Sequence, residues 1–248
     1  MDAQSLKVYW RPGCSSCVRV KEFLSGLGVD YESINVSATP EAMEDLRSLG
    51  VRTVPVVTRG KDYVFAQELA DVSRFLGRQV EFRRLPAPAL VEKWLNVLRA
   101  AQHHIQQIPL ARLGERATEG RDRSIRDLAY HIYQVADAFL QAVEHGNEDI
   151  AAVYNAPPPP QDIQSYSASI IARVESWWSR QADKACSGTV KTYYGVQPLH
   201  HLLERSTWHS AQHARQIGVV LERLGVRVER PLGEADYAGL PMPAGVWE

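Results

Sequence analysis

The sequence is poor in features that mark several large classes of protein. It has three cysteines in 248 residues, too few for a zinc site with four cysteine ligands within one chain. No window approaches the roughly 18 consecutive apolar residues that indicate a membrane-spanning helix. The 28 lysines and arginines balance the 29 aspartates and glutamates, so we expect neither nucleic acid nor a membrane as a partner.

The first residues also lack the pattern of a secretion signal, because no basic segment is followed by an apolar run and a small-residue cleavage site. We therefore expect a cytoplasmic protein. In that reducing compartment a Cys-x-x-Cys pair is more often catalytic or metal-binding than a structural disulfide.

The hydrophobic pattern changes once along the chain, which is long enough for two domains of ordinary size. Up to residue 82, extended runs and amphipathic helices alternate in the order βαβαββα, which predicts an α/β domain. A proline-containing spacer follows, after which the strand signal disappears and four long helical patterns predict an all-α four-helix bundle. The predicted parts are an α/β domain at 1–82, a linker at 83–88, a bundle at 89–225 and a C-terminal tail at 226–248. The helical patterns cover residues 88–108, 124–145, 164–186 and 198–224.

The segment Cys14-Ser15-Ser16-Cys17 carries the chemistry of the first domain. It follows an expected strand at 6–10 and a Pro-Gly turn, which places Cys14 at the N-terminus of the next helix. Unpaired N–H groups and the helix dipole at that end favour the thiolate. We predict that Cys14 is the attacking thiolate in thiol–disulfide exchange and that Cys17 is the resolving cysteine. The alternatives are that the Cys-x-x-Cys spacing arises by chance or that it is half of a zinc site.

The Cys-Ser-Ser-Cys segment, Thr53-Val54-Pro55 before the third strand and the order of elements together resemble a glutaredoxin. The resemblance implies a thioredoxin-like fold and thiol–disulfide exchange. It also implies that Pro55 follows a cis peptide bond and that Thr53 and Val54 bind the backbone of a thiol peptide. Arg11 would meet a carboxylate of that ligand; a solvated arginine is the alternative. The chain departs from the family at residues 66–68, where Ala-Gln-Glu replaces the Gly-Gly and acidic segment that holds glutathione.

Three of the eight histidines carry the chemistry of the second domain. His209 and His213, at i and i+4, share the inward face of the last long helix, and His131 lies on the apolar stripe of the second. Three converging neutral imidazoles suit a divalent ion such as Zn, Ni or Fe and leave positions open for water or a thiol. Core histidines without a metal are the alternative, and His201 is a reserve ligand.

The segments around these histidines, residues 128–132 and 207–213, resemble the DinB superfamily. That resemblance implies a four-helix bundle in which one histidine of the second helix and two of the fourth hold a divalent metal. It also implies a homodimer through the bundle. Several members of the superfamily use a low-molecular-weight thiol such as glutathione as cosubstrate, as S-transferases or isomerases.

Two thiol-linked modules on one chain predict a thiol-dependent redox or transferase enzyme. The metal would hold a small thiol that attacks an electrophilic or disulfide substrate, and Cys14 and Cys17 would then resolve or reduce the product. External thiol or a thiol reductase would reset the pair. The alternatives are a redox-responsive metal sensor and a glutaredoxin with a non-catalytic dimerisation bundle. Cys186 is interpreted as a packed free thiol.

Overall fold

The computed structural model describes residues 5–247, which divide into two compact units. One unit contains the residues up to Phe82 together with those from Pro243 onward, and the other contains Arg83–Met242. Within the described residues, no helix is both long and apolar enough to cross a membrane.

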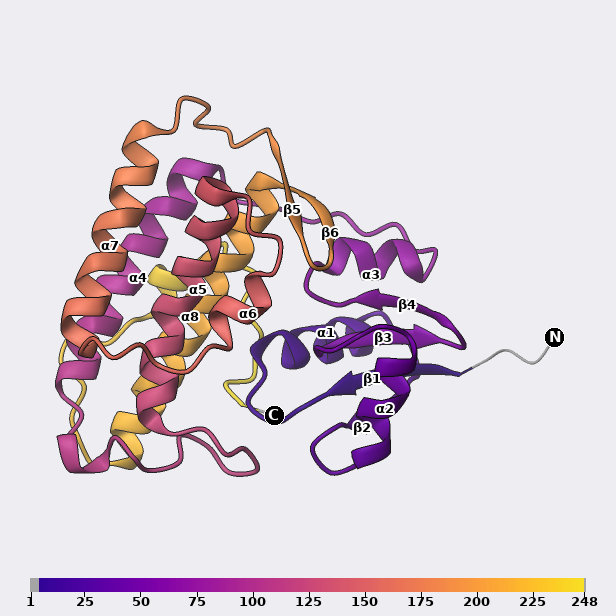
Figure 1. The fold of residues 1–248 in the computed structure, drawn as a ribbon, viewed down its shortest axis with the longest axis horizontal. Coiled ribbons are helices and arrows are strands. Elements are labelled where there is room, and N and C mark those ends of the chain that lie inside the picture. The colour runs from indigo at the N-terminus through magenta and orange to yellow at the C-terminus, as the bar shows by residue number, and fades with distance from the viewer. Residues whose placement is uncertain (1–4, 248) are drawn as a thin grey trace. The chain divides into compact units, whose positions relative to one another are not determined.

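The first unit is a mixed four-stranded sheet with helices on both faces, as the thioredoxin-like prediction requires (Figure 1). The strand order is β2-β1-β3-β4, with β1 parallel to β2 and antiparallel to β3. The elements are β1 (Leu6–Trp10), α1 (Ser15–Gly26), β2 (Glu32–Asn35), α2 (Pro40–Ser48), β3 (Val56–Arg59), β4 (Asp62–Phe65) and α3 (Leu69–Phe75). The predicted order βαβαββα is confirmed.

Successive side chains of the central strands point to opposite faces of this sheet, so each face has its own apolar cluster. Leu6 and Val8 of β1 pack with residues of α1 and α3 in one apolar cluster. Tyr9 of β1 packs on the opposite face with Ala42 and Leu46 of α2. The helix that follows Cys14 is therefore held against the centre of the sheet.

The end of the chain returns to this unit. The backbone N–H groups of Ala244 and Gly245 donate to the two carboxylate oxygens of Glu22 on α1, each at 2.9 Å. The chain therefore leaves the first unit after Phe82 and enters it again at Pro243.

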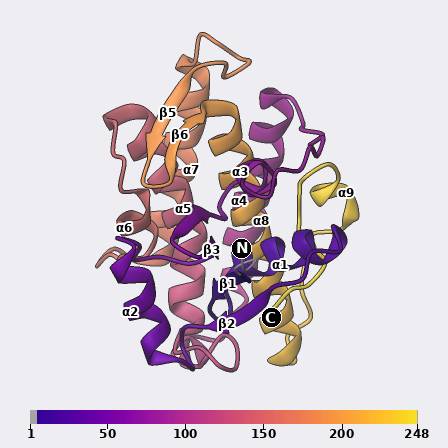
Figure 2. The same cartoon turned by 90° about the vertical axis from the view of Figure 1, so that its right-hand side faces the viewer.

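The second unit is the predicted four-helix bundle, in which α8 packs against α4 and α5, and α7 packs against the same two helices (Figure 1 and Figure 2). Trp94 on α4 donates to the hydroxyl of Ser210 on α8, which donates to the carbonyl of Ile132 on α5. This chain of hydrogen bonds ties three helices together in the buried core. The helices are α4 (Ala87–Gln106), α5 (Ile125–His145), α6 (Ile150–Tyr154), α7 (Ile163–Arg180), α8 (Leu199–Arg223) and α9 (Glu234–Tyr237), with a 3-10 turn at Leu110–Arg112.

The structure differs from the sequence prediction between α7 and α8. The third helix of the bundle ends at Arg180 and not at 186, because Gln181 is extended and Asp183 accepts the N–H groups of Ala185 and Ser187 in a turn. A hairpin follows where no strand was expected, formed by β5 (Thr189–Thr192) and β6 (Gly195–Pro198). Each strand has four residues, too few for the alternation to stand out beside long helical patterns.

Candidate functional site

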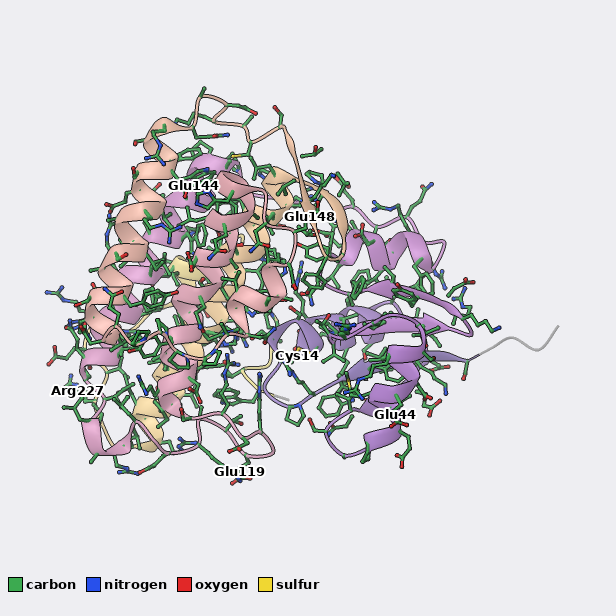
Figure 3. All side chains as sticks on the ribbon, viewed as in Figure 1. Cys14, Glu44, Glu119, Glu144, Glu148 and Arg227 are labelled. Carbon is green, nitrogen blue, oxygen red and sulfur yellow. A yellow bond between two sulfur atoms is a disulfide. The ribbon has the colours of Figure 1, made fainter. Side chains whose placement is uncertain are left out.

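The turn before α1 places the two cysteines in different surroundings. Gly13 has a φ of 66°, a left-handed conformation that turns the chain into the helix. Cys14, which is labelled in Figure 3, is the N-cap of α1. Its sulfur accepts the N–H of Cys17 at 3.3 Å. The two residues form a disulfide, with their Cα atoms 5.2 Å apart. Cys14 is half-buried and Cys17 is fully buried, so a substrate reaches the sulfur of Cys14 more readily.

The other thiol-binding residues predicted in the first domain lie at the same edge of the sheet. Tyr9 near the end of β1 pairs with Val56 at the start of antiparallel β3. The segment from Arg11 to Cys14 and the segment from Thr53 to Pro55 therefore flank one edge. The Val54–Pro55 bond is cis, as expected. The buried hydroxyl of Thr53 has no hydrogen-bond partner among the described residues, which leaves it available to a ligand.

Residues 66–68, where the chain departs from the glutaredoxin pattern, have structural roles. Gln67 accepts a hydrogen bond from the hydroxyl of Ser16 at 3.1 Å, and both side chains are buried. Glu68 is the N-cap of α3, and its carboxylate accepts the N–H of Ala70 at 3.1 Å. This segment therefore joins α1 to the start of α3.

The structure brings His131 of α5 together with His209 and His213 of α8. The ring centroids of His131 and His213 are 4.6 Å apart, and those of His209 and His213 are 4.8 Å apart. One nitrogen from each ring lies within 4.8 Å of the others, and all three residues are buried. The reserve candidate His201 is outside this group.

Oxygen atoms fix two of the rings. Nδ1 of His131 lies 2.6 Å from the carbonyl oxygen of Tyr154, and Nδ1 of His213 lies 2.6 Å from the side-chain oxygen of Gln216. Each Nδ1 must donate to its oxygen, which leaves the lone pair on Nε2 of both rings. Nε2 of His213 and Nδ1 of His209 are buried without a hydrogen-bond partner among the described residues. Imidazoles held in this way are typical metal ligands.

The protonation state of the rings also suits a metal. Burial lowers the pKa of all three histidines well below 6.5, and the charges of Arg123 and neighbouring groups lower it further. All three imidazoles are therefore neutral near pH 7, which is the form that coordinates a cation. The converging nitrogens of the three rings, two of them buried without a hydrogen-bond partner among the described residues, fit a divalent ion with three protein ligands, so the triad could hold one.

Side chains that the sequence analysis did not single out surround the triad. The hydroxyl of Tyr154 on α6 lies 2.7 Å from that of Tyr193 in the turn of the hairpin. The guanidinium carbon of Arg205 lies 5.4 Å from the centre of the Tyr154 ring. Arg205 precedes His209 by four residues, so helical spacing alone could have identified it.

Comparison with known proteins identifies the first domain. A family model for glutaredoxin matches residues 6–64. The glutaredoxin-like protein NrdH of Escherichia coli K12 is 42% identical over 55 residues, which are 22% of this chain and 68% of that protein. Through this domain the chain belongs to the glutaredoxin family. The glutaredoxin domain is also 34% identical to NrdH of Lactococcus lactis subsp. lactis over 59 residues, 24% of this chain and 81% of that protein.

Solved structures resemble the remainder of the chain only distantly. The structure of YjoA, a DinB-like protein of Bacillus subtilis, aligns with 58% of this chain over 96% of the YjoA chain, with 14% sequence identity and a TM-score of 0.48. The structure of a mycothiol-dependent maleylpyruvate isomerase aligns with 56% of this chain over 64% of the isomerase chain, with 19% sequence identity and a TM-score of 0.43. These likenesses assign no activity, so the chemistry of the bundle rests on its own residues.

The buried triad predicts that metal-free protein loses stability in mild acid. The pKa of each of the three histidines is lowered in the folded state, whereas the unfolded chain titrates near 6.5. Below that value the unfolded chain binds more protons than the folded one. The free energy of unfolding should therefore fall with decreasing pH, by up to about 1.4 kcal/mol per pH unit for each histidine.

Urea midpoints of chelator-treated protein at about pH 7 and about pH 5.5 measure this fall. His209→Gln removes one of the three buried imidazoles and should make the fall smaller by roughly a third. His145→Gln changes an exposed histidine at the end of α5 and should leave the fall unchanged. Identical midpoints at the two pH values in the wild-type protein would contradict the assignment of neutral, buried imidazoles.

Proposed function

We propose that the protein is a thiol-dependent redox or transferase enzyme. In this proposal the histidine triad activates a low-molecular-weight thiol, and the Cys14–Cys17 pair resolves or reduces the resulting thiol product. The observation that carries it is the pairing, in one chain, of a helix-capping Cys14 backed by a buried Cys17 with three buried, neutral imidazoles.

The dithiol half of the proposal is disulfide exchange. The thiolate of Cys14 attacks one sulfur of a substrate disulfide, forms a mixed disulfide and releases the other half as a thiolate. The sulfur of Cys17 then attacks the sulfur of Cys14, which releases the second half and leaves the Cys14–Cys17 disulfide. Two equivalents of external thiol, or a thiol reductase, return both cysteines to thiols. The backbone N–H of Cys17 already points at the sulfur of Cys14, where it stabilises negative charge.

The bundle half of the proposal is thiol activation. A divalent ion bound by His131, His209 and His213 would lower the pKa of a coordinated thiol and hold it as the thiolate. The carbonyl of Tyr154 and the side chain of Gln216 orient two of the rings for this role. Burial lowers the pKa of the three imidazoles and keeps them in the neutral form that binds a cation.

The two halves connect through their products. A small thiolate that attacks a disulfide substrate forms a mixed disulfide with one half of it and releases the other half as a thiolate. That mixed disulfide is the kind of molecule that Cys14 attacks. The two sites then catalyse consecutive steps in the reduction of one disulfide, with external thiol as the final reductant.

Substitution of the two cysteines should separate their roles. Cys14→Ser should abolish reduction of a small disulfide such as hydroxyethyl disulfide, because the attacking sulfur is lost. Cys17→Ser should leave a mixed disulfide on Cys14, because nothing resolves it. Turnover and intact-protein mass spectra after disulfide challenge provide the measurements.

Cys186→Ser is the matched control, since it removes a buried thiol outside the pair and should leave turnover unchanged. An adduct on Cys17 in the wild-type protein would reverse the assigned roles. A wild-type protein with no turnover would contradict the enzyme and favour a redox-responsive sensor.

Elemental analysis should find one divalent ion per chain in protein purified without an affinity tag. His213→Ala removes a ligand whose Nε2 has no other partner among the described residues and should lose most of the metal. His145→Ala should keep it all, because that residue is exposed at the end of α5. Equal metal content in all three proteins would contradict the proposed site.

A further inference from the structure

The segment that follows α8 is fixed to α4 on both sides of residues 231–234, which we call the arch. Before the arch, Nε2 of His104 lies 3.0 Å from the carbonyl oxygen of Arg230. After it, Nζ of Lys93 donates to the carbonyl oxygen of Ala235 at 2.8 Å. Both ends of the arch are therefore held by hydrogen bonds from side chains of α4.

A cavity of about 430 Å³ lies between the arch and α8, and its volume is within the range that small-molecule sites have. Ala214, Gly218 and Val219 of α8 line one side of it. Pro231 and Leu232 of the arch also line it. No member of the histidine triad is among the lining residues, so the cavity is separate from the candidate metal site.

The glycine at position 218 has no structural explanation in the packing of α8. Glycine destabilises the interior of a helix relative to alanine. A Cβ at Gly218 would meet no atom within 4 Å, so no neighbouring group requires a glycine there. Ala214 lies one helical turn earlier on the same face. The two residues leave a nearly bare stretch of helix on the cavity side, which a flat molecule can approach closely.

His104 is the buried polar side chain in the lining of the cavity, with 2% of its surface exposed. Its Nε2 must donate to the carbonyl oxygen of Arg230, which leaves a lone pair on Nδ1. Nδ1 is buried and has no hydrogen-bond partner among the described residues. An acceptor buried in this way is costly, and a ligand that supplies a donor removes the cost. The carboxylates of Glu222 and Glu234 also line the cavity, but both residues are exposed and belong to its rim.

We propose that this cavity binds a flat, largely apolar molecule that carries a hydrogen-bond donor, such as the hydroxyl of a phenol or naphthol. The flat body lies against Ala214 and Gly218, and Nδ1 of His104 accepts the hydrogen bond of the donor. The hydrogen bonds to α4 hold the arch in place, so the cavity is formed before the ligand binds. The inference is independent of the proposed function, because it involves neither the metal nor the dithiol.

Two probes of nearly equal size separate recognition of the donor from recognition of apolar surface. They are 2-naphthol and 2-methylnaphthalene, which differ by a hydroxyl in place of a methyl group. A cavity that recognises only apolar surface favours the hydrocarbon, because water solvates it less well. Equilibrium dialysis with the full chain should instead show naphthol bound roughly 10-fold more tightly, since only naphthol satisfies Nδ1 of His104.

Gly218→Leu tests the location of the site. The leucine side chain occupies the cavity next to α8 and should weaken binding of naphthol by roughly 10-fold or more. The melting temperature should not fall, because the new Cβ meets no atom within 4 Å and leucine favours a helix. Gly26→Leu is the matched control, since Gly26 is an exposed helical glycine of α1 whose Cβ would also meet no atom within 4 Å. It should leave the affinity for naphthol unchanged.

His104→Gln tests the acceptor. The glutamine amide can still donate to the carbonyl oxygen of Arg230, but the imidazole lone pair is lost. The variant should therefore lose the preference for naphthol and still bind the hydrocarbon.

Tighter binding of the hydrocarbon to the wild-type protein, or no binding of naphthol, would overturn the inference without the need for any variant to fold. Unchanged naphthol affinity in Gly218→Leu would overturn the location. A preference for naphthol that survives His104→Gln would overturn the role of His104.

Discussion

The bundle depends on how three imidazoles are accommodated in its core. Burial of a polar ring without a partner is costly, and this chain offsets the cost at His131 and His213 by giving each Nδ1 an oxygen to donate to. The same hydrogen bonds turn the remaining nitrogens toward a common centre. Folding of α6, which supplies the carbonyl of Tyr154, is thereby coupled to the geometry of the triad.

The redox domain depends on a different constraint, the start of α1. Gly13 turns the chain, Cys14 caps the helix and the central strands carry the cis-proline segment to the same edge of the sheet. In family members the segment after the last strand holds glutathione, whereas in this chain Gln67 and Glu68 bind to α1 and α3.

Sequence periodicity identified the histidines correctly as inward-facing, because each lies on a long helix whose apolar stripe is unambiguous. The Pro-Gly turn after the first strand also predicted that Cys14 lies at the start of a helix, and the structure places Cys14 at the N-cap of α1 with Cys17 in the first turn. Periodicity missed Tyr154 as a partner of His131 because α6 has five residues and no periodicity of its own. It missed the hairpin of Tyr193 because strands of four residues give a weak signal beside α7 and α8.

The central claim is that the triad holds a metal that accepts a thiol, and X-ray absorption at the metal edge tests it most directly. The account predicts nitrogen scatterers at about 2.0–2.1 Å in the purified protein and a new sulfur scatterer at about 2.3 Å after a low-molecular-weight thiol is added. The protein should carry Cys14→Ser and Cys17→Ser so that the added sulfur is not its own. A spectrum that contains no sulfur after saturation with the thiol would contradict the account.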